Sequence, residues 1–335
     1  MFTIRKSLFT VVCSIYFIAA YTQSYAPDVL GDGYQFHTIQ MPDDYEGKVV
    51  CTLVKKASEP ETNQAVLYVH GYNDYFFQSQ LGDSIVSHGY NFYAVDLRKY
   101  GRSLLPHQEP FYCKSLTEYF ADIDSALTII AKEGNTKVFL MGHSTGGLIT
   151  SLYLNNKKQA SVAGLILNSP FLDMNVSWFM ERIAIPVVSF LGKFFPNMKV
   201  QGYGKASYSH SLLSNHKGEW YFNTDWKMLN SYPKRAGWIR AIHIGQKQVK
   251  KGLTISCPVL VLSSDKSSVE KEEWNDRYLS SDIVLDVNDI QTRGAGLGNQ
   301  VTRDTVPDGI HDLILSPEPA RSVAYRIIVD WLKKM

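Results

Sequence analysis

The serine at position 144 stands in a pattern that could make it a nucleophile. Residues 138–147 read VFLMGHSTGG, with Gly142 two places before the serine and Gly146 two places after it. The apolar run predicts a strand that ends at the serine, and TGGLITSLYLNN predicts a helix that begins at once. The glycines leave room where side chains would collide in so tight a turn. We therefore expect a nucleophile elbow that presents the Ser144 hydroxyl over the edge of a sheet.

A serine hydroxyl is a poor nucleophile until a neighbouring imidazole takes its proton. In a sheet with such an elbow, the chain order is serine, acid, histidine, and the histidine lies in a loop after the last strand. Among the nine histidines, His311 meets this condition, because it follows VTRDTVPDG (301–309), which predicts a final strand and turn, and precedes a predicted helix. The sequence predicts that His311 is the general base for Ser144.

Two aspartates compete for the role of the carboxylate that orients His311. Asp265 follows the buried-looking run VLVLSS, which is a usual place for that carboxylate, but it is far from His311 along the chain. Asp286, in DIVLDVNDI, is separated from His311 by what reads as one short helix and one strand. Because this is the shortest path from an acid loop to a histidine loop, the sequence favours Asp286, with Asp265 as the alternative.

Two backbone N–H groups could stabilise negative charge on a substrate oxygen. Thr145 begins the predicted helix, where unpaired N–H groups and the positive end of the helix dipole lie beside the serine. The second candidate is Tyr72, because AVLYVHG (65–71) predicts a strand whose last residue, Gly71, lets the backbone approach a substrate closely. The sequence therefore predicts an oxyanion hole made by the N–H groups of Tyr72 and Thr145.

The elements that position these residues alternate along the chain. Near-continuous apolar runs predict parallel strands that are covered on both faces. These runs lie at 65–71, 91–98, 137–144, 162–170 and 257–264. Helical patterns between them, such as 115–134, predict an α/β fold with a doubly wound, mostly parallel sheet. From 174 to 252 the alternation stops, and many aromatic residues predict an inserted helical cap.

The N-terminal residues differ from the rest of the chain in their pattern of charge and hydrophobicity. MFTIRK carries two positive charges, Leu8–Ala20 has none, and small or polar residues follow, which is typical of a signal peptide. The sequence thus predicts export to the periplasm or out of the cell, with an uncleaved N-terminal anchor as the alternative. The expected organisation is a signal peptide (1–24), a first part of the core (25–173), the cap (174–252) and a second part of the core (253–335).

Composition limits the possible partners and cofactors. Lys and Arg number 34 against 32 Asp and Glu, so the net charge of +2 gives no electrostatic reason to expect nucleic acid. After removal of residues 1–24 the cysteines are Cys51, Cys113 and Cys257, whose odd number and wide spacing predict no disulfide framework. CxxC and HExxH motifs are absent from the sequence, and the expected chemistry needs no metal and no organic cofactor. The sequence does not indicate an oligomeric state.

Taken together, these features resemble the α/β-hydrolase superfamily, and within it the serine-aminopeptidase-like (S33) branch that includes monoacylglycerol lipases and lysophospholipases. The resembling motifs are HGYNDYFF, DLRKYGRS (96–103), GHSTGG and GIHDLILS (309–316), and the resemblance covers about residues 34–334. The chain departs from the branch at Lys99 and Tyr100, and in an insertion before Asp286. We expect the charged residues of DLRKYGRS to hold their loop by ion pairs.

The resemblance implies an enzyme that hydrolyses carboxylic esters through an acyl-enzyme on Ser144. Its substrate would be a small acyl ester or lipid, and contact with a membrane surface would occur only through that substrate. One alternative is an aminopeptidase, which would need a carboxylate in the cap to hold the substrate's ammonium group. Another is a non-catalytic member of the fold that binds a lipid in the cap.

Overall fold

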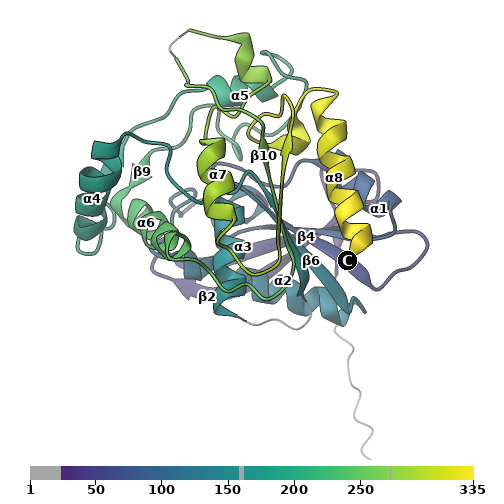
Figure 1. The fold of residues 1–335 in the computed structure, drawn as a ribbon. Helices are drawn as coiled ribbons and strands as arrows, with labels where there is room; N and C mark the ends of the chain where they lie inside the picture. The colour runs from purple at the N-terminus through teal and green to yellow at the C-terminus, as the bar shows by residue number, and fades with distance from the viewer. Residues whose placement is uncertain (1–23, 158–161, 272) are drawn as a thin grey trace, which may run out of the picture.

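The computed structural model describes residues 24–157, 162–271 and 273–335 (Figure 1). The predicted signal peptide falls almost entirely on residues 1–23 and therefore lies outside the described residues. Among the helices of the described part, none combines the length and the apolar character needed to cross a bilayer.

A mostly parallel sheet forms the centre of the fold. In the described residues its strands are β1 (Ala26–Pro27), β2 (Gln35–Asp44), β3 (Gly47–Lys56), β4 (Gln64–Val69), β5 (Asn91–Asp96), β6 (Lys137–His143), β7 (Val162–Asn168), β10 (Val259–Ser264) and β11 (Val301–Val306). They lie side by side in the order β1-β2-β3-β5-β4-β6-β7-β10-β11. Pairing is antiparallel from β1 to β5 and parallel from β5 to β11. The predicted fold class is confirmed.

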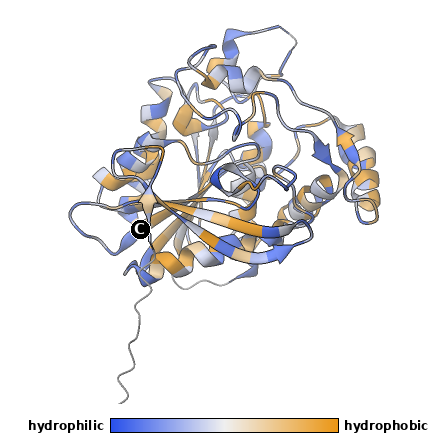
Figure 2. Ribbon diagram, turned by 180° about the vertical axis from the view of Figure 1, so that it is seen from behind, coloured by the Kyte–Doolittle hydropathy of each residue, from blue (hydrophilic) through white to orange (hydrophobic). Residues whose placement is uncertain are grey.

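Helices cover both faces of this sheet, which explains why its strands are apolar throughout. The helices are α1 (Ser79–Ser87), α2 (Phe120–Lys132), α3 (Thr145–Asn156), α6 (Ala236–Lys250), α7 (Val287–Gly294) and α8 (Ala320–Lys334). Along β4, Leu67 and Val69 pack with α2, α3, α6 and α7, whereas Val66 and Tyr68 pack with α1 and α8. Figure 2 shows the resulting hydrophobic strands running through the middle of the molecule.

The chain between β7 and β10 forms a set of smaller elements. They are η3 (Met180–Ala184), α4 (Ile185–Leu191), β8 (Lys199–Gln201), α5 (Ser207–Leu212), β9 (Lys234–Arg235) and α6. In Figure 1, α4 lies at the left margin beyond α6, and α5 lies at the top. β8 and β9 pair as a separate two-stranded sheet, which the sequence did not predict. The boundaries of the cap at 174 and 252 stay a prediction.

Ion pairs hold the loop after β5, as the sequence predicts. The guanidinium of Arg102 lies 2.8 Å from a carboxylate oxygen of Asp96, and Arg98 lies 2.6 Å from Asp122. Lys99, where the chain departs from the branch, is fully buried and pairs with two carboxylates of the β2–β3 hairpin. Removing one partner of such a buried pair costs about 3–5 kcal/mol. These charged groups stabilise the loop below the site.

Candidate active site

Ser144 occupies a sharp turn between β6 and α3. Its backbone angles, φ 51° and ψ −117°, lie in a region that residues with a side chain rarely adopt. The turn is held by two hydrogen bonds: the N–H of Ser144 donates to the carbonyl oxygen of Asn168 at 3.1 Å, and its own carbonyl accepts from the N–H of Phe171 at 2.9 Å. These bonds fix the serine where its side chain leaves the end of the sheet.

The glycines around the serine allow three backbone segments to meet. A Cβ atom on Gly142 would lie 2.5 Å from Oγ1 of Thr150, inside α3. A Cβ on Gly146 would lie 2.3 Å from the carbonyl oxygen of Val69, at the end of β4. Both distances are too short for any side chain, so the strand, the helix and the neighbouring strand can come this close only through glycine.

We expect Gly146→Ala to lower the free energy of unfolding by about 1–3 kcal/mol, because the added methyl group must push against rigid backbone. The control is Gly202→Ala, since a Cβ at Gly202 meets nothing within 4 Å. Urea unfolding of both variants, followed by circular dichroism, measures the difference. Equal stability of the two variants would contradict the close packing of α3 against β4.

A chain of hydrogen bonds connects Ser144 to a buried carboxylate. Nε2 of His311 lies 3.0 Å from Oγ of Ser144, and Nδ1 of the same ring lies 2.9 Å from Oδ2 of Asp282. All three residues are buried, and Ser144 is the most exposed of them at 9%. The structure thus brings Ser144 and His311 together, as their types and order along the chain predict.

The carboxylate beside His311 is Asp282, so both predicted acids were wrong as partners of this ring. Asp286 caps the N-terminus of α7 with its side chain. Asp265 accepts a hydrogen bond from the backbone N–H of Asp308 and is partly exposed to solvent. Each of the two carboxylates therefore accepts a hydrogen bond from a backbone N–H group, and neither contacts the imidazole.

The loop after β10 folds back on itself to position Asp282. Its backbone N–H donates to the carbonyl oxygen of Lys266 at 3.0 Å, which ties the end of the loop to its beginning. Oδ1 of Asp282 accepts from the N–H groups of Val284 and Leu285, both at 2.8 Å. These two bonds leave Oδ2 for His311. An aspartate at the start of a turn often accepts hydrogen bonds from the backbone N–H groups that follow it, and this pattern can be recognised in a sequence. In DIVLDVN both Asp282 and Asp286 have the pattern, so it does not distinguish them.

Of the two predicted oxyanion donors, Thr145 lies at the turn, and Tyr72 directly follows Gly71, which contacts the turn. Thr145 is the first residue of α3, and Gly71 packs so closely against Ser144 that a Cβ on it would lie 3.1 Å from that of the serine. Within the described residues, the backbone N–H groups of Tyr72 and Thr145 donate no hydrogen bond. His70 accepts a hydrogen bond from the N–H of the residue after β5, which anchors the loop. Both N–H groups are thus available to a substrate oxygen.

A second buried polar cluster lies behind the His311 ring. Its members are Asp74, His143, Asp312 and Lys227, and the His143 and His311 ring centroids lie 5.0 Å apart. Burial lowers the pKa of His143. Burial acts to raise the pKa of the Asp74 carboxyl, but the Lys227 ammonium, 2.8 Å away, outweighs it and the pKa lies below its ordinary value. Lys227 offsets the charge of Asp74, while Asp312 accepts hydrogen bonds from the side-chain amides of Gln78 and Asn168.

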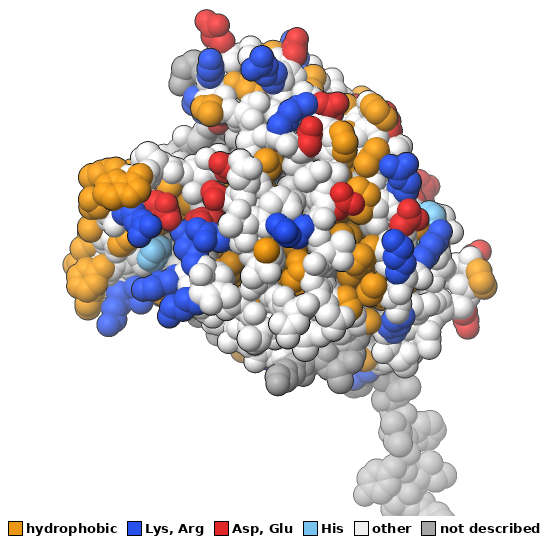
Figure 3. All heavy atoms as spheres, in the orientation of Figure 1, with side chains coloured by type: hydrophobic (Ala, Val, Ile, Leu, Met, Phe, Trp, Pro, Cys, Tyr) orange, Lys and Arg blue, Asp and Glu red, His pale blue; other side chains and the backbone are white. Residues whose placement is uncertain are grey.

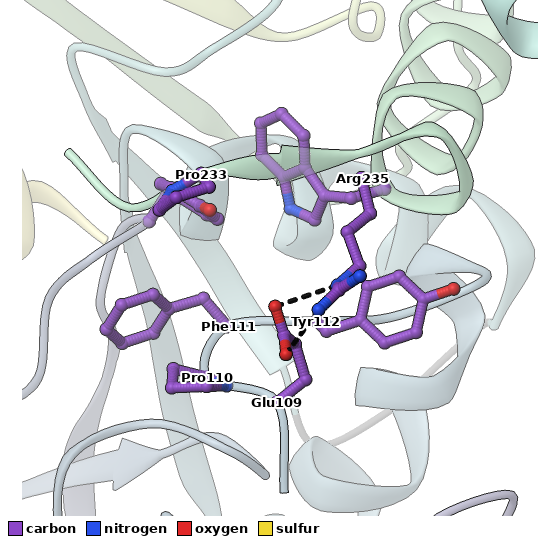
Figure 4. Close-up of a pocket in the computed structure, with 8 residues that line it drawn as sticks. Glu109, Pro110, Phe111, Tyr112, Pro233 and Arg235 are labelled. Atoms are coloured by element: carbon purple, nitrogen blue, oxygen red, sulfur yellow. Dashed lines mark hydrogen bonds and ion pairs between the residues drawn. The ribbon is translucent and has the colours of Figure 1, made fainter. Parts of the chain in front are cut away.

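A small pocket lies beside Tyr72, between the core and the elements that follow β8 (Figure 4). Its lining residues are Tyr72, Glu109, Pro110, Phe111, Tyr112, Pro233, Arg235 and Trp238. Figure 4 shows the Glu109 carboxylate facing the Arg235 guanidinium, and their closest atoms are 2.6 Å apart. The Tyr72 ring lies 4.6 Å from Trp238, centroid to centroid. The side chain of the residue that offers an oxyanion N–H therefore faces a largely apolar pocket.

Known proteins resemble this chain in sequence and in structure. Phospholipase YtpA of Bacillus subtilis (strain 168) is 27% identical over 122 residues, which are 36% of this chain and 45% of that protein, so the match spans less than half of this relative. The monoglyceride lipase of Saccharomyces cerevisiae, solved as a soluble variant with a substrate analog, superposes with a TM-score of 0.63 at 16% identity, over 89% of this chain and 96% of that one.

Two further solved structures share the architecture. The monoacylglycerol lipase of Paleococcus ferrophilus has a TM-score of 0.57 at 21% identity and covers 85% of this chain and 98% of its own. A carboxyl esterase of Bacillus coagulans has a TM-score of 0.63 at 14% identity, and the match covers 89% of this chain and 98% of the esterase. At these identities the likeness demonstrates a common fold. The model of the serine aminopeptidase S33 family matches residues 60–285, more than half of the chain, and the protein therefore belongs to this family of α/β-hydrolases.

Proposed function

We propose that the protein is a serine hydrolase that cleaves the carboxylic ester of a monoacylglycerol-like or lysophospholipid-like substrate. The observation that carries this proposal is the hydrogen-bonded chain from Ser144 through His311 to Asp282. A serine, an imidazole and a buried carboxylate in this order are the components of acyl transfer.

In the first step, Oγ of Ser144 attacks the ester carbonyl carbon while Nε2 of His311 takes the hydroxyl proton. The carbonyl oxygen becomes an oxyanion, which accepts hydrogen bonds from the N–H groups of Tyr72 and Thr145. Asp282 holds Nδ1–H of the ring and stabilises the imidazolium. Collapse of the tetrahedral intermediate breaks the ester C–O bond, and His311 protonates the leaving alcohol.

In the second step, water replaces the alcohol. His311 removes a proton from the water, the hydroxide attacks the acyl carbon, and the same two N–H groups bind the new oxyanion. When this intermediate collapses, the bond from the acyl carbon to Oγ of Ser144 breaks and the serine recovers its proton from His311. The products are a carboxylic acid and an alcohol, and no cofactor takes part.

The pocket beside Tyr72 is lined mainly by aromatic rings and prolines, but its volume of about 10 Å³ has room for about one water molecule. The proposal of an apolar acyl group therefore rests on the relatives. The relatives named as a phospholipase, two monoacylglycerol lipases and an esterase also act on esters. The choice of a lipid ester is our proposal for this chain.

An aminopeptidase would need a free carboxylate near the site to bind the substrate's ammonium group. Of the three cap carboxylates that could serve, Glu181 pairs with Lys250 and Glu219 pairs with Arg321. The third, Asp225, is exposed and forms no ion pair with another described residue. In the pocket, Glu109 is paired with Arg235. These pairs favour ester over peptide hydrolysis, although the family carries the peptidase name.

The test compares acyl esters of graded chain length with aminoacyl arylamides on the full chain. We expect turnover of esters that increases with acyl length, and no turnover of arylamides above that of a Ser144→Ala control. Covalent labelling by a fluorophosphonate probe separates an enzyme from a lipid-binding member of the fold. Arylamide turnover that exceeds ester turnover would favour the peptidase, and the absence of Ser144-dependent labelling would favour the binding protein.

A further inference from the structure

The helical segment formed by η3 and α4 presents a row of apolar side chains to solvent. The row, which we call the outer face of α4, consists of Phe179, Ile183, Val187, Phe190 and Phe194. Successive members are three or four residues apart, which aligns them along one side of a helix. Each is between 44% and 63% exposed, and the rings of Phe190 and Phe194 lie 5.5 Å apart.

The opposite side of α4 is already packed. Ile185 and Ser189 are buried, and the carbonyl oxygen of Ser189 accepts a hydrogen bond from Arg240 of α6. Gly192 lies so close to Ala236 that a Cβ on it would lie 2.4 Å from the alanine carbonyl oxygen. A helix that is apolar on both sides is normally covered on both sides. Here no described residue covers the outer face.

Neighbouring aromatic residues extend this apolar surface. They are Trp178 and Phe195, each more than 60% exposed. In Figure 3, orange side chains gather at the left edge of the molecule, over α4, with blue Lys and Arg side chains below them. A patch of this extent on a protein surface marks an interaction site.

Basic residues of the same segment accompany the outer face. Residues 174–204 contain Arg182, Lys193 and Lys199, and their one acidic residue, Glu181, is paired with Lys250. The Lys193 ammonium lies 5.6 Å from the centre of the Phe194 ring. The chain as a whole has a net charge of only +2, so this part of the surface is unusually basic. Basic side chains beside an apolar helix face match an anionic lipid surface, whose headgroups attract Lys and Arg while its acyl chains take the apolar groups.

We propose that the outer face of α4 docks the protein on an anionic lipid surface. Phe190 and Phe194 enter the acyl boundary, and Lys193 and Lys199 lie at the headgroups. A second copy of the chain is a poorer occupant, because it would bring the same positive charge against itself. The apolar stretch at 8–20 follows Arg5 and Lys6 and brings no acidic residue. The proposal goes beyond the expectation that the substrate alone contacts the membrane.

Vesicle flotation of the full chain tests this proposal. The vesicles contain phosphatidylcholine alone or a mixture with phosphatidylglycerol, and they contain no substrate. We expect the double variant F190S/F194S to bind about a hundredfold more weakly, at about tenfold per side chain. The matched control is Y221S/V269S, because Tyr221 and Val269 are each 82% exposed and lie outside the face; its binding should equal that of the unchanged chain. K193E/K199E should lose the preference for phosphatidylglycerol.

A local readout comes from hydroxyl-radical footprinting of the same samples. We expect vesicles to protect Phe190 and Phe194 and to leave Tyr221 reactive. The proposal is overturned if F190S/F194S floats as well as the control, or if the face is protected in the monomer without vesicles. It is also overturned if light scattering finds a dimer that this variant abolishes. None of these measurements depends on ester hydrolysis, so the docking and the proposed function fail separately. Circular dichroism checks that the variants are folded.

Discussion

Ser144→Ala is expected to lower kcat/KM for ester hydrolysis by about 10⁵-fold or more. The reason is geometric: Oγ of Ser144 is the nucleophilic atom that Nε2 of His311 contacts, at 3.0 Å. Without it, no acyl-enzyme forms, and the two N–H groups at the turn can only stabilise slow attack by water. Steady-state turnover of an acyl ester and labelling by a fluorophosphonate probe both measure the loss.

The loss should occur without a loss of stability. Alanine fits the turn as well as serine does, because the hydrogen bonds that hold residue 144 come from its backbone N–H and carbonyl. The melting temperature of Ser144→Ala should therefore stay within a few degrees of the unchanged chain. A variant that keeps its fold and still hydrolyses esters at the original rate would exclude the acyl-enzyme mechanism.

The sheet could be predicted from the sequence because its strands are buried on both faces. Runs such as 65–71 and 257–264 are almost continuously apolar, and the structure places them at β4 and β10. The helix α1 lies between the runs at 65–71 and 91–98, where the alternation predicts a helix, and it contains Gly82. That glycine is needed: a Cβ there would lie 2.1 Å from the hydroxyl of Tyr34. A tertiary contact thus explains a residue that is unfavourable inside a helix.

The site could be predicted in part. Ser144 is fixed by a local turn, and His311 by its place after the last strand, so both follow from chain order. The acid does not, because its position depends on how the loop after β10 closes. The pairing of Asp282 with Lys266 brings the end of that loop back to its beginning. The short distance along the sequence from Asp286 to His311 favoured Asp286. The contact that decides which aspartate reaches His311 joins residues that are far apart in the sequence.

Composition also could not distinguish the two roles of the aromatic residues in the predicted cap. Trp238 is buried and packs on the Tyr72 ring, whereas Trp178 is exposed beside α4. In the sequence, both tryptophans belong to the same aromatic-rich segment, 174–252. Only the packing of α4 on α6 decides which side of each helix is covered, and therefore which rings pack the core and which face outward.

Asp282→Asn is expected to lower kcat/KM by about 10³–10⁴-fold, although the side chain keeps its shape. The N–H groups of Val284 and Leu285 both donate to Oδ1 of Asp282. In the variant they require the amide oxygen at that position, so the NH₂ group of the asparagine must face His311. An NH₂ group can only donate, and Nδ1 of His311 would have to accept from it. The proton of the neutral ring then sits on Nε2, which can no longer take the proton of Ser144.

The matched controls are Asp286→Asn and Asp265→Asn, which remove the same charge nearby. Asparagine caps a helix about as well as aspartate, so Asp286→Asn should keep α7 and nearly all activity. Asp265 accepts one backbone hydrogen bond outside the site, and an amide oxygen accepts it equally well. Steady-state kinetics on the three variants, together with their melting temperatures, therefore assigns the acid. If Asp282→Asn kept full activity while one of the controls lost it, the hydrogen bond between Asp282 and His311 would have no part in the reaction.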